Sequence, residues 1–244
     1  MEVNKFSSIV RKLLDEVDQT QQKNIELASK LIYESMKKGG IFHVFCTGHS
    51  HMIAEEFFYR AGGLIPVNPL LMPFLMQHEG AVSSTKFERL SGVAKIVFDG
   101  ADIRKGEPIL IASNSGINAV PIEMAMLAKE NGNPVITLTS ANVSAQVQSR
   151  HASGKRLFEL GDIVLDTNVP KGDSVIDCKN GLKTGSVSSI VSLYIVQKLA
   201  INITNTFVEN GEDPPIFKSA NVAGGDEYNE KLLKKYKGRI RCLY

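Results

Sequence analysis

Two histidines and a serine lie together in "TGHSH", directly after the apolar run "IFHVFC". Residues of these types could bind a metal, activate a nucleophile or hold an anion. A zinc site built on His49 and His51 needs at least one further protein ligand. The other histidines are His43, His78 and His151, and none has a convincing metal-ligand spacing to this pair. We therefore expect no bound metal, and no other feature of the sequence calls for a cofactor.

Four polar turns share the composition of this stretch. They read "TGHS" (47–50), "SNSGIN" (113–118), "TSANVS" (139–144) and "LKTGSVSS" (182–189). Their hydroxyls donate hydrogen bonds, their small residues let backbone N–H groups approach a ligand, and a helix is expected after each of them. Together they suit a phosphate group, although Ser, Thr and Asn are also the ordinary helix caps. The second turn has more polar side chains than a single cap requires.

Common nucleotide and hydrolase motifs are missing from the sequence. It contains no GxxxxGK[ST], no GxGxxG after the first expected strand, and no GxSxG. These absences argue against an ordinary P-loop, a dinucleotide site and a nucleophile elbow.

The composition is that of an ordinary globular protein, with 43% hydrophobic and 22% charged residues. The net charge of +2 predicts no nucleic-acid partner and no attraction to an acidic membrane. No apolar run is long enough for a spanning helix, and no secretory signal is evident. The three cysteines are widely spaced, as is usual in a reducing compartment. We expect a cytoplasmic protein.

The elements that must position the turns follow from apolar periodicity, beginning with a long helix over residues 3–37. Strands are expected at 41–46, 64–67, 107–113, 134–140 and 162–167, and helices at 51–61, 118–130 and 185–203. Residues 93–101 fit a helix or a strand, and we favour a helix. This alternation predicts an α/β fold, namely a doubly wound three-layer α/β/α sandwich around a mainly parallel sheet of about five strands. Ligands of such sheets bind at the carboxyl ends of the strands, where three of the four turns are expected.

The chain divides into three expected parts. Residues 1–38 form an N-terminal helical segment that we expect at a subunit contact, and residues 39–206 form the ligand-binding domain. Residues 207–244 are polar and rich in Gly, Pro and Asn, so they indicate an irregular tail that packs on the domain or on a partner subunit. The expected assembly is a homodimer or a homotetramer.

The strand "PILIAS" running into "SNSGIN" resembles the phosphosugar-binding turn of the SIS (sugar isomerase) domain family. In that family a Ser-x-Ser-Gly turn holds the sugar phosphate, and the resemblance extends over about residues 20–205 in order and spacing. It implies an SIS-type, flavodoxin-like domain at 39–206 that binds a phosphorylated sugar. The phosphate ligands that it implies are Gly48, Ser50, Ser113, Asn114, Ser115, Gly116, Asn118, Thr139 and Ser140.

The sequence resembles two branches of this family, and it lacks part of the pattern of each. Phosphoheptose isomerases carry a catalytic glutamate downstream of the first-turn serine, at a position that Arg60 occupies here. N-acetylmuramic acid 6-phosphate etherases carry an "EGAE"-like stretch, which "HEGAVSS" (78–84) resembles. We therefore expect Glu79 as the acid/base, with His78 or His51 assisting. The plain alternative for Glu79 is a solvated carboxylate at a helix start.

Further contacts to the sugar are expected from the turns and from the cationic segment "SRHASGKRL". The candidates are His49, His151, Lys155, Lys183 and Ser186. For the cationic segment, a basic surface loop is the alternative. The expected function is that of an enzyme on a phosphorylated sugar, either an isomerase working through an enediol or a lyase that eliminates a substituent. A phosphosugar-binding protein that acts through a protein partner without catalysis is the alternative, and Arg60 favours it.

Overall fold

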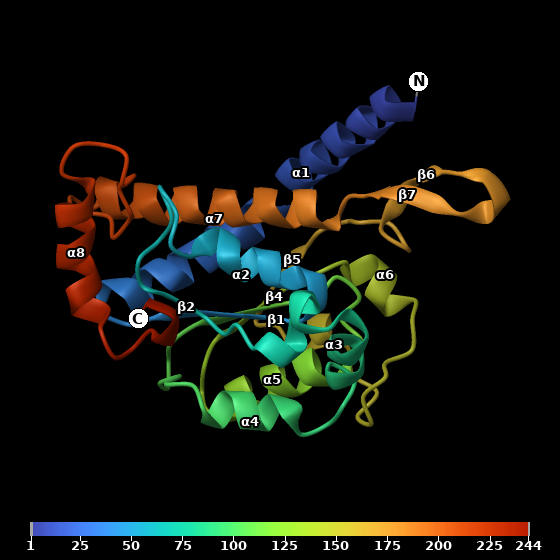
Figure 1. Ribbon diagram of the computed structural model, residues 1–244, viewed down its shortest axis with the longest axis horizontal. Coiled ribbons are helices and arrows are strands. Elements are labelled where there is room, and N and C mark those ends of the chain that lie inside the picture. Colours follow the sequence, from blue (N-terminus) through green and yellow to red (C-terminus); the bar gives the residue numbers. More distant parts are fainter. Residues whose placement is uncertain (1, 244) are drawn as a thin grey trace.

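Five parallel strands form the central sheet of the chain, whose computed structural model describes residues 2–243 (Figure 1). They are β1 (Phe42–Cys46), β2 (Val67–Pro69), β3 (Ile109–Ala112), β4 (Val135–Thr139) and β5 (Ile163–Asp166). Their order across the sheet is β2-β1-β3-β4-β5, which is the order of a doubly wound, flavodoxin-like sheet. The predicted fold class is therefore confirmed.

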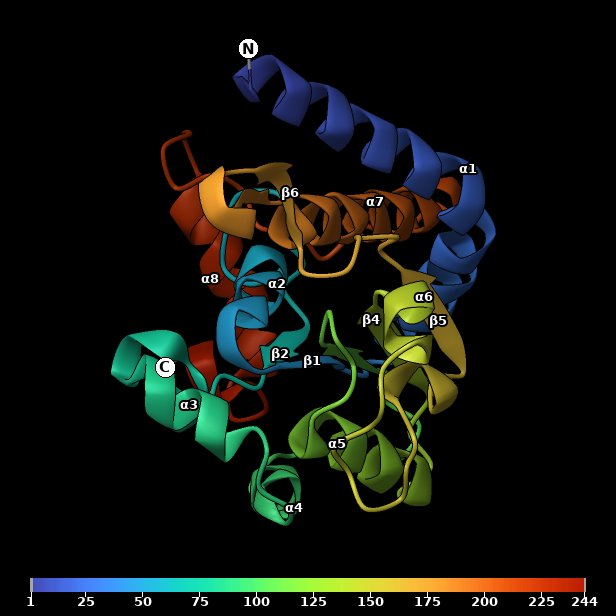
Figure 2. The same ribbon diagram turned by 90° about the vertical axis from the view of Figure 1, so that its right-hand side faces the viewer.

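Helices cover both faces of this sheet (Figure 2). One face carries α1 (Glu2–Lys37), α2 (His51–Phe57) and α7 (Ser188–Glu209). The other face carries α4 (Val93–Asp99) and α5 (Ala119–Glu130). Two short helices are α3 (Ala81–Phe87), beside the turn after β1, and α6 (Ala141–Ala145), directly after β4. Single 3-10 turns lie at Gly48–Ser50, Pro73–Leu75, Gln77–Glu79, Leu157–Glu159, Lys179–Gly181 and Arg241–Leu243.

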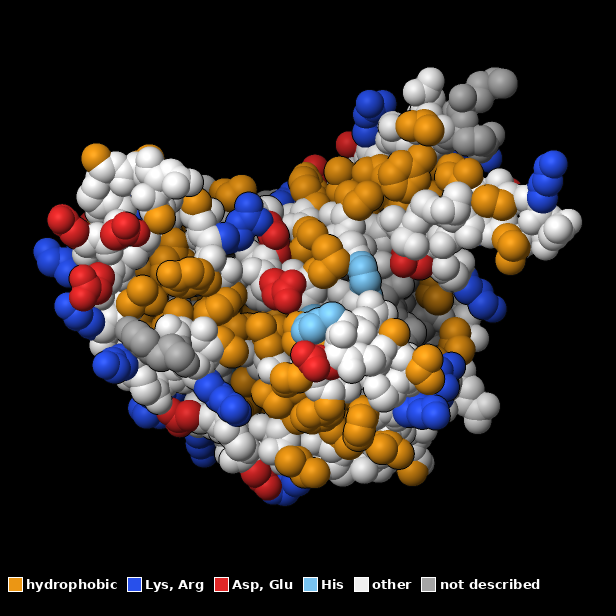
Figure 3. All heavy atoms as spheres, viewed as in Figure 1, with side chains coloured by type: hydrophobic (Ala, Val, Ile, Leu, Met, Phe, Trp, Pro, Cys, Tyr) orange, Lys and Arg blue, Asp and Glu red, His pale blue; other side chains and the backbone are white. Residues whose placement is uncertain are grey.

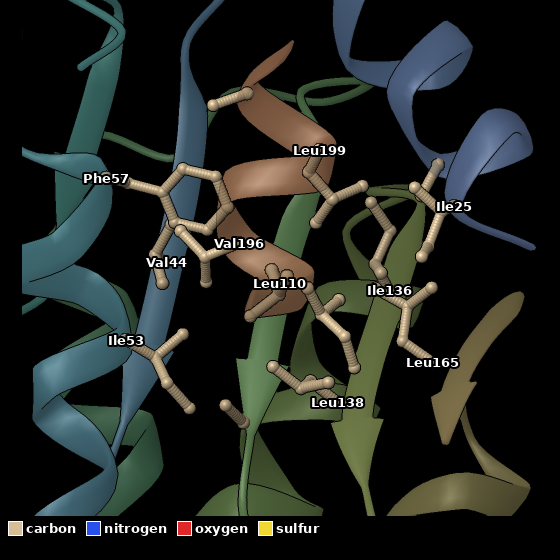
Figure 4. Close-up of a cluster of buried hydrophobic side chains, with 14 of the residues drawn as sticks. Ile25, Val44, Ile53, Phe57, Leu110, Ile136, Leu138, Leu165, Val196 and Leu199 are labelled. Atoms are coloured by element: carbon tan, nitrogen blue, oxygen red, sulfur yellow. The ribbon is translucent and has the colours of Figure 1, made fainter. Parts of the chain in front are cut away.

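The larger apolar core lies between the sheet and the layer of α1, α2 and α7 (Figure 4). Val44, Leu110 and Ile136 come from three neighbouring strands and are fully buried there. Phe57 of α2 and Leu199 of α7 pack onto them, and each such side chain stabilises the fold by roughly 1.5–3 kcal/mol. A second core fills the opposite face. Because both faces are covered, β1 and β4 are buried along their whole length, which explains why apolar residues predominate in both strands.

Most of α1 belongs to the larger core. Val17, Ile25 and Ile32 are fully buried in it, and the helix packs along α7. Its first turns extend beyond the sheet (Figure 1). The N-terminal segment is therefore an outer layer of the same domain, and its role at a subunit contact stays a prediction. No helix in the part of the chain that the structure describes has the length and apolar character needed to cross a bilayer.

An antiparallel hairpin between β5 and α7 was not predicted from the sequence. Its strands are β6 (Ser174–Asp177) and β7 (Lys183–Ser186). The hairpin takes up the residues at which the long helix was expected to begin, so α7 starts at Ser188. The second strand of the main sheet also differs, because pairing with β1 begins only at Val67.

The C-terminal tail is more regular than expected. Residues 225–236 form a helix, α8 (Gly225–Tyr236), so the prediction of an irregular tail is wrong for this part. Phe217, Tyr236 and Ile240 are buried against Ile41 and Ile65 in a third apolar cluster. The tail therefore packs on its own domain, at the edge opposite to the polar turns.

Candidate functional site

A cavity of about 250 Å³ opens at the carboxyl edge of the sheet, next to the first turn of α7. It meets the ends of β1, β3, β4 and β5. Neutral hydrogen-bonding side chains form much of its lining, namely Ser50, Asn114, Thr167, Ser186, Ser188 and Ser189. Met52, Ile53 and Leu193 supply apolar surface. This lining suits a small ligand that carries many oxygen atoms.

The first turn brings His49 to the cavity, whereas His51, the first residue of α2, points inward. Gly48 has a φ of +55°, and after it His49 and Ser50 reach the cavity wall, where His49 Nδ1 lies 3.2 Å from Ser189 Oγ. His51 is buried, and its Nδ1 donates to the Gly48 carbonyl at 2.9 Å. Burial lowers the pKa of His51. No described residue binds its Nε2, and within residues 2–243 no group of acidic, His or Cys side chains is placed to hold a metal.

The second turn is tightly folded by a glycine. Gly116 has a φ of +62°, and its N–H donates to Ser113 Oγ at 3.2 Å. Ser113 is buried, whereas Ser115 is exposed to solvent. Asn114 is partly buried and lines the cavity. Of the side chains predicted on this turn, Asn114 is the one that faces the cavity.

The third turn supports the second. Thr139 and Ser140 are fully buried. Thr139 Oγ1 donates to the carbonyl of Asn114 at 3.2 Å, and Ser140 Oγ donates to the carbonyl of Val169 at 2.7 Å. Both hydroxyls are therefore engaged within the protein and lie outside the cavity lining. Their predicted contact with a phosphate remains a prediction.

A carboxylate that the sequence did not single out, Glu88, lies between the first two turns. Its oxygens accept hydrogen bonds from Thr47 Oγ1 at 2.9 Å and from Asn118 Nδ2 at 2.7 Å. Burial raises the pKa of Glu88, and the hydrogen bond from Thr47 together with the charges of Arg89 and Arg150 opposes that rise. Asn118, predicted as a phosphate ligand, is thus bound to this carboxylate.

A second unpredicted carboxylate, Asp173, caps the start of α7. Its Oδ1 accepts the N–H groups of Val187 at 2.9 Å and Ser188 at 2.7 Å, and its Oδ2 accepts the Ser188 hydroxyl at 2.7 Å. Asp173 also lines the cavity. Because a negative side chain already occupies this helix start, an anionic ligand finds its free donors elsewhere.

The predicted acid/base pair lies on the surface. His78 and Glu79 belong to the 3-10 turn Gln77–Glu79, and their side chains are 65% and 57% exposed. They approach each other to 3.7 Å. Their neighbour Gln77 lines the cavity, whereas these two side chains do not. A catalytic role for them remains a prediction.

The predicted sugar contacts are dispersed. Ser186 lines the cavity, but Lys183 lies on the hairpin, paired with Asp177 at 3.1 Å. His151 approaches Glu123 of α5 at 3.5 Å, and Lys155 is exposed to solvent. The cation of this segment that reaches the turns is Arg150, which donates to Asn118 Oδ1 at 2.8 Å.

Solved structures of known proteins share this fold at low sequence identity. A phosphoheptose isomerase from Francisella tularensis has a TM-score of 0.56 and is 18% identical, covering 83% of this chain and 96% of that chain. The phosphoheptose isomerase GmhA from Neisseria gonorrhoeae also has a TM-score of 0.56 and is 16% identical, covering 82% of this chain and 97% of that chain. These likenesses show the fold.

Sequence comparison shows the family. The UPF0309 protein TTE0306 of Caldanaerobacter subterraneus subsp. tengcongensis is 42% identical over 238 residues, which cover 96% of this chain and 97% of that protein. A family model described as the SIS domain matches residues 5–140. Since this match spans more than half of the 244 residues, the chain belongs to the SIS domain family.

Proposed function

We propose that this chain binds a phosphorylated sugar at the carboxyl edge of its sheet and moves a proton on it. The reaction is an isomerisation through an enediol or the elimination of a substituent. The cavity carries the proposal, because hydroxyl and amide side chains line it where the ends of four parallel strands converge. We place the activity in the cytoplasm, a setting that the three free cysteines favour.

The second turn is the best-formed place for the phosphate. Asn114 lines the cavity, and no residue in the described range accepts the backbone N–H of Ser115 or Ile117. The start of α5 follows at once and adds its partial positive charge. Phosphate oxygens only accept hydrogen bonds, so a turn with unused donors suits them.

The solved structures that share the fold agree with a ligand of this class, since both of those compared above are phosphoheptose isomerases. Holding the phosphate orients the sugar, and a positioned acid/base contributes roughly 10²- to 10⁴-fold to the rate. The family resemblance assigns that role to Glu79. Its exposure to solvent leaves the role open to a more buried carboxylate.

A binding protein without catalysis is the alternative. Arg60 stands where phosphoheptose isomerases carry their glutamate, and its guanidinium forms an ion pair with Glu56, four residues earlier in α2. A permanently charged cation cannot serve as a base there. This observation favours a chain that senses the phosphosugar and passes the signal to a protein partner.

Calorimetric titration with sugar phosphates, the matching free sugars and inorganic phosphate tests the proposed binding. We expect Asn114→Asp to weaken sugar-phosphate binding by at least about tenfold, because it adds a negative charge at the cavity with little change of shape. Asn205→Asp, at an exposed site on α7, is the matched control and leaves binding unchanged.

Turnover of each bound sugar phosphate is followed by NMR. Formation of an isomer or an elimination product supports the enzyme. Binding without any product supports the sensing alternative, and a wild-type chain that binds no sugar phosphate contradicts the proposal.

A further inference from the structure

Glu88 is a carboxylate held between two turns by neutral donors. It follows α3, and it accepts one hydrogen bond from Thr47 at the end of β1 and one from Asn118 at the start of α5. No basic side chain in residues 2–243 forms an ion pair with it. Burying this charge costs free energy, which the charges of Arg89 and Arg150 offset only in part. A neutral side chain could tie the turns together without that cost, so a carboxylate at this position points to a chemical use.

Gly48 of the first turn lies beside this carboxylate. A Cβ at Gly48 would lie 3.9 Å from Glu88 Oε2, an ordinary contact distance. Glu88 itself remains partly accessible to solvent. Glu88 does not line the cavity itself. A ligand reaches the carboxylate where it extends from the cavity over the first and second turns.

We propose that Glu88 is the general base that takes the proton from the carbon next to the carbonyl of the bound sugar phosphate, an inference that rests on the proposed function. In an aldose–ketose exchange, the C2–H bond breaks and its proton moves to a Glu88 oxygen. The electron pair forms the C1=C2 bond of the enediol, and the carbonyl oxygen takes a proton from water. Glu88 then returns its proton to C1, while the C2 hydroxyl gives its proton to water and becomes the carbonyl. No electrons leave the sugar, so no co-reactant is required.

The surroundings of Glu88 suit this task better than those of Glu79. Burial raises the pKa of Glu88, and a base whose pKa lies nearer to neutrality is better matched to proton transfer at carbon. The side chain of Glu79 is 57% exposed, and its Oε1 lies 3.7 Å from His78 Nε2. Solvent thus reaches Glu79 freely, whereas the fold holds Glu88 in one place.

A cation lies close to the proposed base. Arg150 donates to Asn118 Oδ1 at 2.8 Å, and the amide of the same Asn118 donates to Glu88. Among the residues that the structure describes, no carboxylate forms an ion pair with Arg150. Its positive charge is therefore available to stabilise the negative oxygen that develops as the enediol forms.

Exchange of the reacting hydrogen with solvent tests the assignment directly. Each sugar phosphate that binds is incubated in D2O with the protein, and deuterium at the carbon next to the carbonyl is followed by NMR. Glu88→Gln is expected to slow exchange by about 10²- to 10⁴-fold while affinity stays within about tenfold of wild type. Glu88→Asp keeps a carboxylate but withdraws it from the substrate, so we expect a smaller loss with normal binding. This second variant also serves if Glu88→Gln does not fold.

Two further variants separate catalysis from a structural role. Thr47→Val removes a hydrogen bond to Glu88 but keeps the carboxylate, so exchange is expected to fall by less than about tenfold. Equal losses in Glu88→Gln and Thr47→Val, or a larger loss in Glu79→Gln than in Glu88→Gln, overturn the assignment. A wild-type chain that binds sugar phosphates without exchange also overturns it and leaves the proposed binding intact. A wild-type chain that binds no sugar phosphate contradicts both the assignment of Glu88 and the proposed binding.

Discussion

Gly116 sets the shape of the turn after β3. Its φ of +62° lies in the left-handed region, and a Cβ there would lie 2.9 Å from Thr139 Oγ1 and 3.1 Å from Ser144 Oγ. Gly154 has a similar φ of +71°, but nothing lies within 4 Å of a Cβ built on it. A side chain at either glycine would therefore strain the backbone. Only at Gly116 would it also make a close contact.

Gly116→Ala is expected to lower the free energy of unfolding by roughly 2–4 kcal/mol, because the close contact adds to the left-handed strain. Gly154→Ala, the matched control, is expected to lower it by roughly 1 kcal/mol. Urea unfolding followed by circular dichroism measures both. Equal losses of unfolding free energy in the two variants would show that backbone strain alone causes the loss. The close contact between the turn and β4 would then contribute nothing.

The polar turns could be found from the sequence, but not the direction of each side chain. Ser50, Asn114 and Ser186 line the cavity. Thr139 and Ser140, which have the same kind of side chain, donate to backbone carbonyls inside the protein. A hydroxyl bonds to whichever acceptor lies nearest. That neighbour depends on how the strands pack, which residue type and spacing do not specify.

Glu88 shows the same limit more strongly. Its partners Thr47 and Asn118 are 41 and 30 residues away in the sequence. They meet only because β1 and β3 are neighbours in the sheet, so that the turns after both strands lie at one edge. The sequence around Glu88 contains no motif that distinguishes it from a surface glutamate.

At the scale of elements, burial decided what could be predicted. The five strands of the main sheet were recognised because a parallel sheet covered on both faces gives continuous apolar runs. The β6–β7 hairpin and α8 bury much less. Most residues of β7 are exposed, and α8 buries only Gly225 and Tyr236 fully. The hairpin therefore leaves no clear period in the sequence. The apolar residues of α8 do recur at helical spacing, at Tyr228, Leu232, Leu233 and Tyr236, but they lie in a segment otherwise rich in Gly, Pro and Asn.

Arg239 attaches the end of the tail to the sheet. Its Nη2 donates to the two oxygens of Glu107 at 2.9 and 3.0 Å, and its Nε donates to Asp102 Oδ2 at 2.6 Å. Glu107 also binds the buried His43 at 2.9 Å. Burial favours a raised pKa for Glu107, but the hydrogen bonds from His43 and Arg239, with backbone N–H groups, outweigh it and lower the pKa to about 2. The carboxylate therefore stays charged and keeps its hold on Arg239.

Arg239→Met is expected to loosen the tail, because Glu107 is left buried without its guanidinium partner. We expect a loss of about 2–4 kcal/mol in the free energy of unfolding, with faster amide hydrogen exchange over residues 237–243. Arg104→Met is the control, since Arg104 is 60% exposed and also pairs with Asp102. It is expected to change stability by less than about 1 kcal/mol. Equal protection of the tail in both variants would contradict this attachment.

At the scale of the molecule, the start of α1 and the β6–β7 hairpin extend together from the body (Figure 1). Apolar side chains gather where they meet (Figure 3). Phe6 lies against the hairpin, since a Cβ at Gly185 would be 3.0 Å from its ring. Ile9 and Val10 are only partly buried against the core. This half-covered apolar surface is where the expected subunit contact fits best.

A second copy that covers this surface makes the chain a homodimer, or a homotetramer if two dimers pair. Ile9→Asp is expected to shift the protein to monomers, because an unpaired charge in an apolar contact costs several kcal/mol. Ile96→Asp, on α4 at the opposite face of the sheet and 74% exposed, is the matched control and keeps the assembly. Sedimentation at micromolar concentration measures both. A wild-type chain that sediments with the mass of one copy refutes the assembly, and dissociation by both variants would place the contact elsewhere.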